Sequence, residues 1–259
     1  NYHGANRVRR VVLLGTPNLG SANSLHAFIE GRKVGLRRIN SEVLASFPSL
    51  YQLFPHPLND WIMTTRGTAL KRDLFDVNIW RRFEWSIFHP KVRQRMVENW
   101  REQGLNAAQI EREFKQFEAY FERHLERARR FVWSLTVRME REPWQLVVYG
   151  GDCTLTPNRV VVEEVRGESV LRLWPDDILN PEPGVDYERL MMQPGDGAVT
   201  KASLLARDVL DPLVPRHQYS HFPLHYPIFL CEGHDALTSN VFFQDNLLHF
   251  LLSQETTRR

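Results

Sequence analysis

The sequence is poor in features that define several classes of protein. It holds only two cysteines, Cys153 and Cys231, which are too few for a disulfide framework or a cysteine-rich zinc site. Each lies at the end of a predicted strand, so a single disulfide between them stays open. The apolar runs fall far short of a bilayer span. We therefore expect no transmembrane segment.

An excess of charge of one sign is also missing. The 33 basic and 31 acidic residues leave a net charge of +2, which gives no field for nucleic acid or for an anionic membrane. Hydrophobic residues still make up 42% of the 259 residues, enough for a sizeable core in one large domain or one and a half. The chain begins at Asn1 without a visible signal peptide, so we expect a processed chain or a fragment.

The most informative local pattern is the stretch 8–21. Its apolar run 11–14 ends at Gly15, which is typical of a strand buried on both faces in a parallel sheet. Mostly turn-forming residues follow, through Ser21. Ligands of open parallel sheets bind just past the carboxyl ends of the strands. The turn is thus predicted to border a site, although an ordinary strand and loop would give the same pattern.

Other elements can be predicted along the chain. Two more buried strands are expected over 144–150 and 226–231, with a β-hairpin over 159–165 and 169–174. The clearest helix is 107–135, which begins with a capping box at Asn106. Its apolar face is formed by residues three and four apart, namely Ile110, Phe114, Phe117, Phe121, Leu125, Ala128, Val132 and Leu135. We interpret its charged face as solvated rather than as a partner-binding surface.

Two loops hold candidates for chemistry. Asp196 lies between two glycines, and His234 follows Gly233 just past a predicted strand. An acid that precedes a histidine at one sheet edge is the chain order of α/β-hydrolases, in which the acid orients an imidazole that deprotonates a serine. A turn aspartate and an ordinary histidine would explain each residue alone. Their joint placement favours the catalytic interpretation.

Two weaker candidates compete with this pair. Asp152 also follows a predicted strand and is a rival for the acid. His217, His221 and His225 are spaced by four, but the prolines among them disfavour the helix that would align them. We therefore expect neither a metal site nor a cofactor.

Four segments resemble α/β-hydrolase lipases, one of them in particular the lecithin:cholesterol acyltransferase-like branch. GTPNLGS (15–21) looks like the strand-end motif that follows the nucleophile helix, and SFPSLYQLFP (46–55) resembles the segment after that strand in this branch. GDGAVTKASLL (195–205) resembles the loop of the catalytic aspartate, and GHDALTSN (233–240) the segment of the catalytic histidine. The resemblance implies Asp196 as the acid and His234 as the base.

The resemblance also implies an architecture and an activity. The fold is expected to be of α/β-hydrolase type, with a mostly parallel sheet from 1–54 and 141–259 and a helical cap over 55–140. The expected activity is hydrolysis or transfer of an acyl ester or lipid through an acyl-serine. The G-x-S-x-G elbow is absent, and Ser21 and Ser24 lack its flanking glycines. We therefore expect the C-terminal portion of such an enzyme, inactive by itself; the alternatives are a non-catalytic binding protein of this fold and a hydrolase of peptides or amides.

Overall fold

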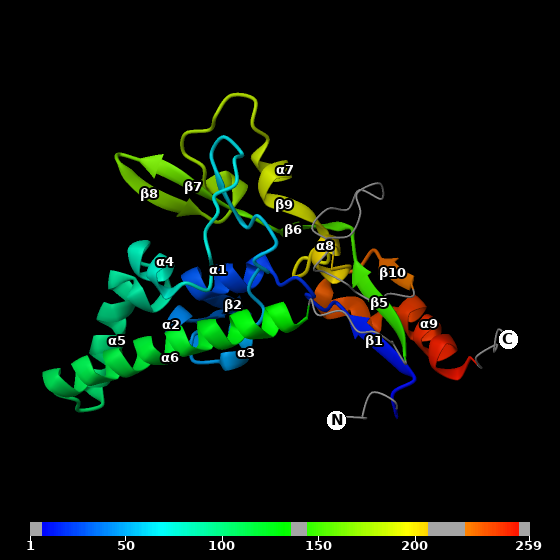
Figure 1. Cartoon of the computed structure of the whole chain (residues 1–259), viewed down its shortest axis with the longest axis horizontal. Helices are drawn as coiled ribbons and strands as arrows, with labels where there is room; N and C mark the ends of the chain where they lie inside the picture. Colours follow the sequence, from blue (N-terminus) through cyan, green and yellow to red (C-terminus); the bar gives the residue numbers. More distant parts are fainter. Residues whose placement is uncertain (1–6, 136–143, 207–225, 254–259) are drawn as a thin grey trace. The chain divides into compact units, whose positions relative to one another are not determined.

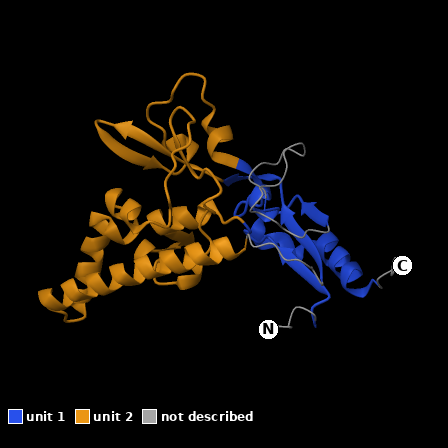
Figure 2. Ribbon diagram, in the orientation of Figure 1, with its two compact units in different colours: residues 1–18, 136–157, 193–259 blue, residues 19–135, 158–192 orange. Residues whose placement is uncertain are grey.

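The computed structural model describes residues 7–135, 144–206 and 226–253, and the chain divides into two compact units (Figure 2). Unit 1 comprises residues 1–18, 136–157 and 193–259, and unit 2 comprises 19–135 and 158–192. The two units therefore alternate along the sequence, and each is built from segments far apart in the chain.

Unit 1 is organised around a three-stranded parallel sheet (Figure 1). The central strand β5 (Gln145–Gly151) pairs with β1 (Arg10–Leu14) on one side and with β10 (Tyr226–Leu230) on the other. The apolar runs predicted as buried strands thus form one sheet. Because all three strands are parallel, their carboxyl ends lie at the same edge.

Both faces of this sheet are covered. Val147 and Tyr149 of β5 pack with 3₁₀ helix η4 (His234–Ser239) and helix α9 (Val241–Leu252) on one face. On the other face, Val148 packs with Val199 and with helix α8 (Lys201–Leu204). This alternation follows from the two-residue period of a strand. Unit 1 is therefore of mixed α/β class with a covered parallel sheet.

A short two-stranded sheet extends the edge where the strands end. Strand β6 (Thr154–Pro157) follows β5 and pairs with β9 (Met192–Gly195). A bridge continues this pairing from Thr154 to Asp196. The loop after β9 is thereby fixed next to the end of β5, although about forty residues separate them in sequence.

Unit 2 is mainly helical and has an aromatic core. Its helices are α1 (Ala22–Glu30), α2 (Ser41–Leu44), α3 (Pro48–Tyr51), α4 (Val77–Arg82), η2 (Ser86–Phe88), α5 (Pro90–Glu102), α6 (Ala107–Ser134), η3 (Pro175–Asp177) and α7 (Tyr187–Met191). Rings of Phe28, Tyr51, Phe54, Trp80 and Phe121 are fully buried and meet mostly edge to face. Such contacts stabilise a core beyond the burial of area alone.

Helix α6 matches its prediction closely. The capping box at Asn106 is formed, and the pairs Glu111–Lys115 and Glu126–Arg130 lie at 3.4 and 2.8 Å. Most of the predicted apolar face is buried or half-buried, including Phe121, but Leu135 at its end is 47% exposed. The periodicity was thus correct up to the C-terminus of the helix.

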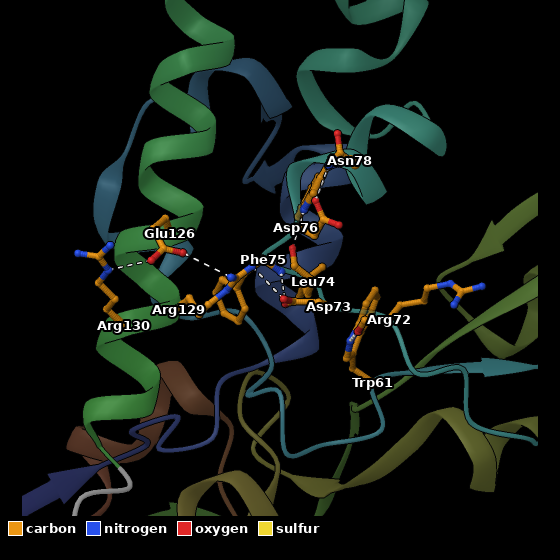
Figure 3. Close-up of polar contacts among 11 residues, drawn as sticks. Trp61, Arg72, Asp73, Leu74, Phe75, Asp76, Asn78, Glu126, Arg129 and Arg130 are labelled. Carbon is orange, nitrogen blue, oxygen red and sulfur yellow. Dashed lines mark hydrogen bonds and ion pairs between the residues drawn. The ribbon is translucent and has the colours of Figure 1, made fainter.

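A polar link ties the loop before α4 to this helix (Figure 3). The Asp73 carboxylate lies 2.8 Å from an Arg129 guanidinium nitrogen and also accepts the N–H of Phe75 at 2.9 Å. Nearby, the Trp61 indole N–H donates to the carbonyl of Arg72 at 3.0 Å. The first contact holds this loop against α6, and the other two fix the conformation of residues 72–75.

Unit 2 also carries two small sheets. Strand β7 (Val160–Val165) pairs antiparallel with β8 (Glu168–Arg172), as the predicted hairpin, and parallel with β4 (Ile62–Thr64). Strands β2 (Arg32–Val34) and β3 (Arg37–Ile39) form a second hairpin, which the sequence patterns did not predict.

The predicted cap lies within unit 2 as far as it is described. Residues 55–135 fall in this unit together with 19–54 and 158–192. Their role as a cap over strand ends stays a prediction. None of the helices in the described part of the chain is long and apolar enough to span a bilayer.

Candidate active site

Backbone N–H groups of its own loop hold the Asp196 carboxylate in place. Its Oδ1 accepts the N–H groups of Ala198 at 2.9 Å and Val199 at 2.7 Å. The preceding Gly195 has no room for a side chain, because a Cβ there would lie 2.3 Å from the carbonyl oxygen of Val199. The carboxylate is consequently fixed in one orientation, and Asp196 is only 3% exposed.

His234 begins η4 and meets this carboxylate. Its Nδ1 lies 2.9 Å from Oδ2 of Asp196, and its backbone N–H donates to the Asp196 carbonyl at 2.8 Å. The expected contact between the two residues is therefore present. The His234 side chain is 39% exposed while that of Asp196 is 1% exposed, so the imidazole connects a buried carboxylate with the surface.

The ionisation of Asp196 supports this geometry. Burial alone would raise its pKa, but hydrogen bonds from His234, Val199 and Ala198, with the attraction of His234, lower the pKa below its ordinary value. The carboxylate is thus ionised at neutral pH and can only accept hydrogen bonds. It follows that Nδ1 of His234 carries the proton of the 2.9 Å contact and that Nε2 is the basic nitrogen.

Two glycines at strand ends bring the pair together. A Cβ on Gly15 would lie 2.8 Å from Cε1 of His234, and Gly15 has a φ of +56°. A Cβ on Gly151 would lie 2.2 Å from the carbonyl oxygen of Glu232 and 2.8 Å from Cβ of Asp196. The end of β1 therefore packs against the base, and the end of β5 packs against the acid.

The two cysteines form a disulfide beside the site. Cys153, just after β5, is bonded to Cys231, just after β10, with their Cα atoms 5.0 Å apart. The single disulfide that the sequence left open is present. It joins the end of β5, which packs against Asp196, to the end of β10, which leads to His234.

The rival acid has another partner. Asp152 lies 2.7 Å from Nζ of Lys201, whose ammonium sits 4.0 Å from the ring centre of Phe229. Among the described contacts, the carboxylate on His234 is that of Asp196 rather than Asp152.

Two further residues help to position the pair. Thr156 is fully buried, and its hydroxyl accepts the N–H of Gly197 at 2.9 Å. Asn240 caps α9 and also donates to Glu232 at 3.0 Å, so it fixes both ends of the segment that holds His234. Thr156 stands out neither by type nor by spacing, so only the pairing of β6 with the acid loop would have indicated it. Asn240, in contrast, ends the motif 233–240 that resembles the histidine segment.

The two serines considered as nucleophiles lie at the start of α1. The hydroxyl of Ser21 caps α1 by accepting the N–H of Asn23 at 3.2 Å, and Ser24 lies within that helix. His217, His221 and His225 are outside the described residues. Within the described ranges, no group of three histidine, cysteine or acidic side chains is placed to hold a metal ion.

Comparison with known proteins does not assign this chain to a family. No family model and no curated protein sequence matches it.

Proposed function

We propose that this chain carries the acid and base of a serine ester hydrolase or acyltransferase of α/β-hydrolase type. The observation that carries the proposal is the 2.9 Å contact between His234 Nδ1 and Asp196 Oδ2. It lies past the carboxyl ends of a parallel sheet with helices on both faces. The acid lies in the loop after β9, next to the end of the central strand β5, and the base follows the edge strand β10. The acid thus precedes the histidine, which is the chain order of this class.

The residues would act as follows. Asp196 holds the imidazole by accepting the Nδ1 proton, so that Nε2 of His234 takes the proton from a serine hydroxyl as its oxygen attacks the ester carbonyl. The imidazolium then returns this proton to the leaving alkoxide. The acyl-serine that remains is cleaved by water in a hydrolase or by an alcohol in a transferase. The proposed substrate is an acyl ester or lipid.

The second candidate function is a binding protein that keeps this fold without catalysis. The observation that favours it is the absence of G-x-S-x-G from the sequence. The hydrolase proposal needs a nucleophile from a part of the protein beyond these 259 residues, whereas the binding alternative needs none.

A spectroscopic test addresses the acid–base pair without any turnover. A histidine Nδ1–H that donates to a carboxylate gives a proton NMR signal downfield of the amides. We expect this signal for His234 and expect its loss in Asp196→Asn. Asp152→Asn is the matched control, because it neutralises the other strand-end carboxylate and should keep the signal. Loss of the signal in Asp152→Asn alone would show that the acid was chosen wrongly.

An assay of p-nitrophenyl esters addresses the reaction. Three proteins are compared: this chain, a protein extended upstream to include a G-x-S-x-G segment, and that longer protein with His234→Ala. We expect turnover only in the second, with a loss of at least about 10⁴-fold in the third. Turnover by the 259-residue chain that depends on Ser21 or Ser24 would mean that the nucleophile lies there. An inactive longer protein would favour the binding alternative.

A further inference from the structure

The hairpin of β2 and β3 has an unusual composition. Residues 31–39 read GRKVGLRRI, with four basic residues and no acidic one. All residues from 32 to 38 are exposed. The hairpin is thus a cationic projection on a chain whose total charge is almost balanced.

The tip of this hairpin is apolar and stands clear of the rest of unit 2. Leu36 is fully exposed (103%) and Val34 is 53% exposed. Gly35 turns the chain with a φ of +58°, and apart from its two chain neighbours no described residue has an atom within 4 Å of where its Cβ would be. Aliphatic side chains at the end of an open hairpin contribute nothing to a core, and both are accessible to a partner.

The four basic side chains of the hairpin form no ion pair in the described part of the chain. Within the described residues, none of Arg32, Lys33, Arg37 and Arg38 lies within ion-pair distance of a carboxylate. Lys33 is directly opposite Arg38 in the register, a like-charge pair that destabilises an isolated hairpin.

The carboxylates nearest in sequence do not change this picture. Glu42 is engaged by Arg95 through two hydrogen bonds of 2.7 and 2.6 Å. Glu30 feels the charge of Arg38 but lies at the base of the hairpin, away from the tip. The cations at the tip are therefore available to an external anion.

We propose that this hairpin docks on the surface of an anionic phospholipid bilayer. Leu36 and Val34 enter the boundary between headgroups and acyl chains, while the four cations bind headgroup phosphates and carboxylates. An aliphatic tip gains free energy in a bilayer and gains little on a nucleic acid. Residues 31–39 also hold no aromatic ring on which a base could stack. The inference does not depend on the proposed ester hydrolysis.

Vesicle flotation tests this docking, because bound protein rises with the lipid while aggregated protein sediments. We expect the 259-residue chain to float with vesicles of phosphatidylcholine and phosphatidylserine, to float less at high salt, and to stay behind with phosphatidylcholine alone. Each basic residue near such a surface contributes about fivefold in affinity. Arg37→Glu with Arg38→Glu should therefore weaken binding by at least about 25-fold.

Matched variants separate the hairpin from general surface effects. Lys91→Glu with Arg112→Glu makes the same change of charge at exposed positions of α5 and α6 and should leave binding unchanged. Leu36→Ser should weaken binding by about tenfold, whereas Leu179→Ser, at another exposed leucine, should not.

Three outcomes would overturn the proposal. The first is no flotation of the parent chain with anionic vesicles. The second is equal flotation of the parent and of the hairpin variants, with circular dichroism showing that all are folded. The third is tight binding to an oligonucleotide, lost in the hairpin variants, without binding to vesicles; this would assign the hairpin to nucleic acid. None of these outcomes involves turnover, so they leave the ester-hydrolase proposal to its own tests.

Discussion

At the scale of single residues, the acid–base pair depends on a glycine that contacts the imidazole. Gly15 has a left-handed φ of +56°, and a methyl group at this position would lie only 2.8 Å from Cε1 of His234. Gly35 has nearly the same φ, +58°, in open space. These two positions separate the cost of backbone strain from the cost of displacing the histidine.

We expect Gly15→Ala to displace the His234 ring and to abolish its downfield Nδ1–H signal. The variant should also lower the free energy of unfolding by about 1–3 kcal/mol, through strain and overpacking. Gly35→Ala should show only the strain, about 1 kcal/mol, and keep the signal. Urea unfolding and proton NMR of both variants check this. An intact signal in Gly15→Ala would mean that the contact does not position the base.

A buried carboxylate in unit 2 has a structural role. Glu163 is 1% exposed, and it accepts hydrogen bonds from Arg172 at 2.6 Å and from the backbone N–H of Asn180 at 2.6 Å. Burial alone would raise its pKa, but these bonds, with that from Leu179, lower the pKa from the ordinary 4.5. The charged form therefore holds residues 179–180 against β7.

Glu163 should contribute stability that depends on pH. Because its pKa is lower in the folded state, the unfolded state binds the proton first as the pH falls below about 4.5. The contribution is complete above that pH and is lost toward the lower pKa of the folded state. We expect Glu163→Gln to cost about 3 kcal/mol at pH 7, since it leaves Arg172 without its buried partner, and to flatten the acid limb. Urea unfolding from pH 3 to 7 checks this, with Glu164→Gln as the exposed control; equal acid limbs in both variants would contradict it.

At the scale of elements, the disulfide joins two strand ends that hydrogen bonds and packing already hold. Cys153 and Cys231 are 78 residues apart in sequence, and a bridge over a loop of this length restricts the unfolded chain strongly. In the folded state, the backbone bond from His234 to Asp196 and the close packing at Gly151 hold the same segments. The bridge should therefore matter more for stability than for the geometry of the pair.

We expect reduction of the disulfide to lower the free energy of unfolding by about 4 kcal/mol. The downfield signal of His234 should persist under native conditions. Cys153→Ser with Cys231→Ser should have the stability of the reduced protein and should not respond to a reductant. Urea unfolding with and without dithiothreitol checks this. Loss of the signal on reduction would show instead that the disulfide positions the base.

Elements with a strong period were predictable, and those defined by distant contacts were not. The mostly apolar stretches 11–14, 144–150 and 226–231 and the period of α6 indicate their structures directly. Strands β2 and β3 have three residues each and an exposed pattern, so no hydrophobic period marks them. For the site, Asp196 and His234 could be selected by their loops, whereas Gly15, Gly151 and Thr156 matter through contacts that only the folded chain creates.

At the scale of the whole molecule, total charge and segregated charge give different expectations. A net charge of +2 argues against a field for an anionic membrane, but it averages over the chain. The hairpin 31–39 holds four of the 33 basic residues and no acid. The total count of charges does not reveal this local excess. The order of residues shows it, and the structure adds that these residues are exposed on one hairpin.

The division into two units leads to the last prediction. The buried clusters around Val147 and Val148 belong to unit 1, and those around Phe121 and Met63 belong to unit 2. Six of the seven tryptophans lie in unit 2, namely Trp61, Trp80, Trp85, Trp100, Trp133 and Trp174. Tryptophan fluorescence therefore follows unit 2, while the Nδ1–H signal of His234 follows unit 1.

We expect Phe121→Ala to cost unit 2 about 3–5 kcal/mol, because Phe121 is fully buried in the aromatic core. In urea, the fluorescence transition should move to lower denaturant while the His234 signal persists. Phe131→Ala is the matched control, since Phe131 lies on the same helix but is 39% exposed; it should change stability by no more than about 0.5 kcal/mol. If both probes move together in Phe121→Ala, the two units unfold as one and the prediction of independent cores is wrong. The physical reason would be that each unit is built from segments that the other unit separates in sequence.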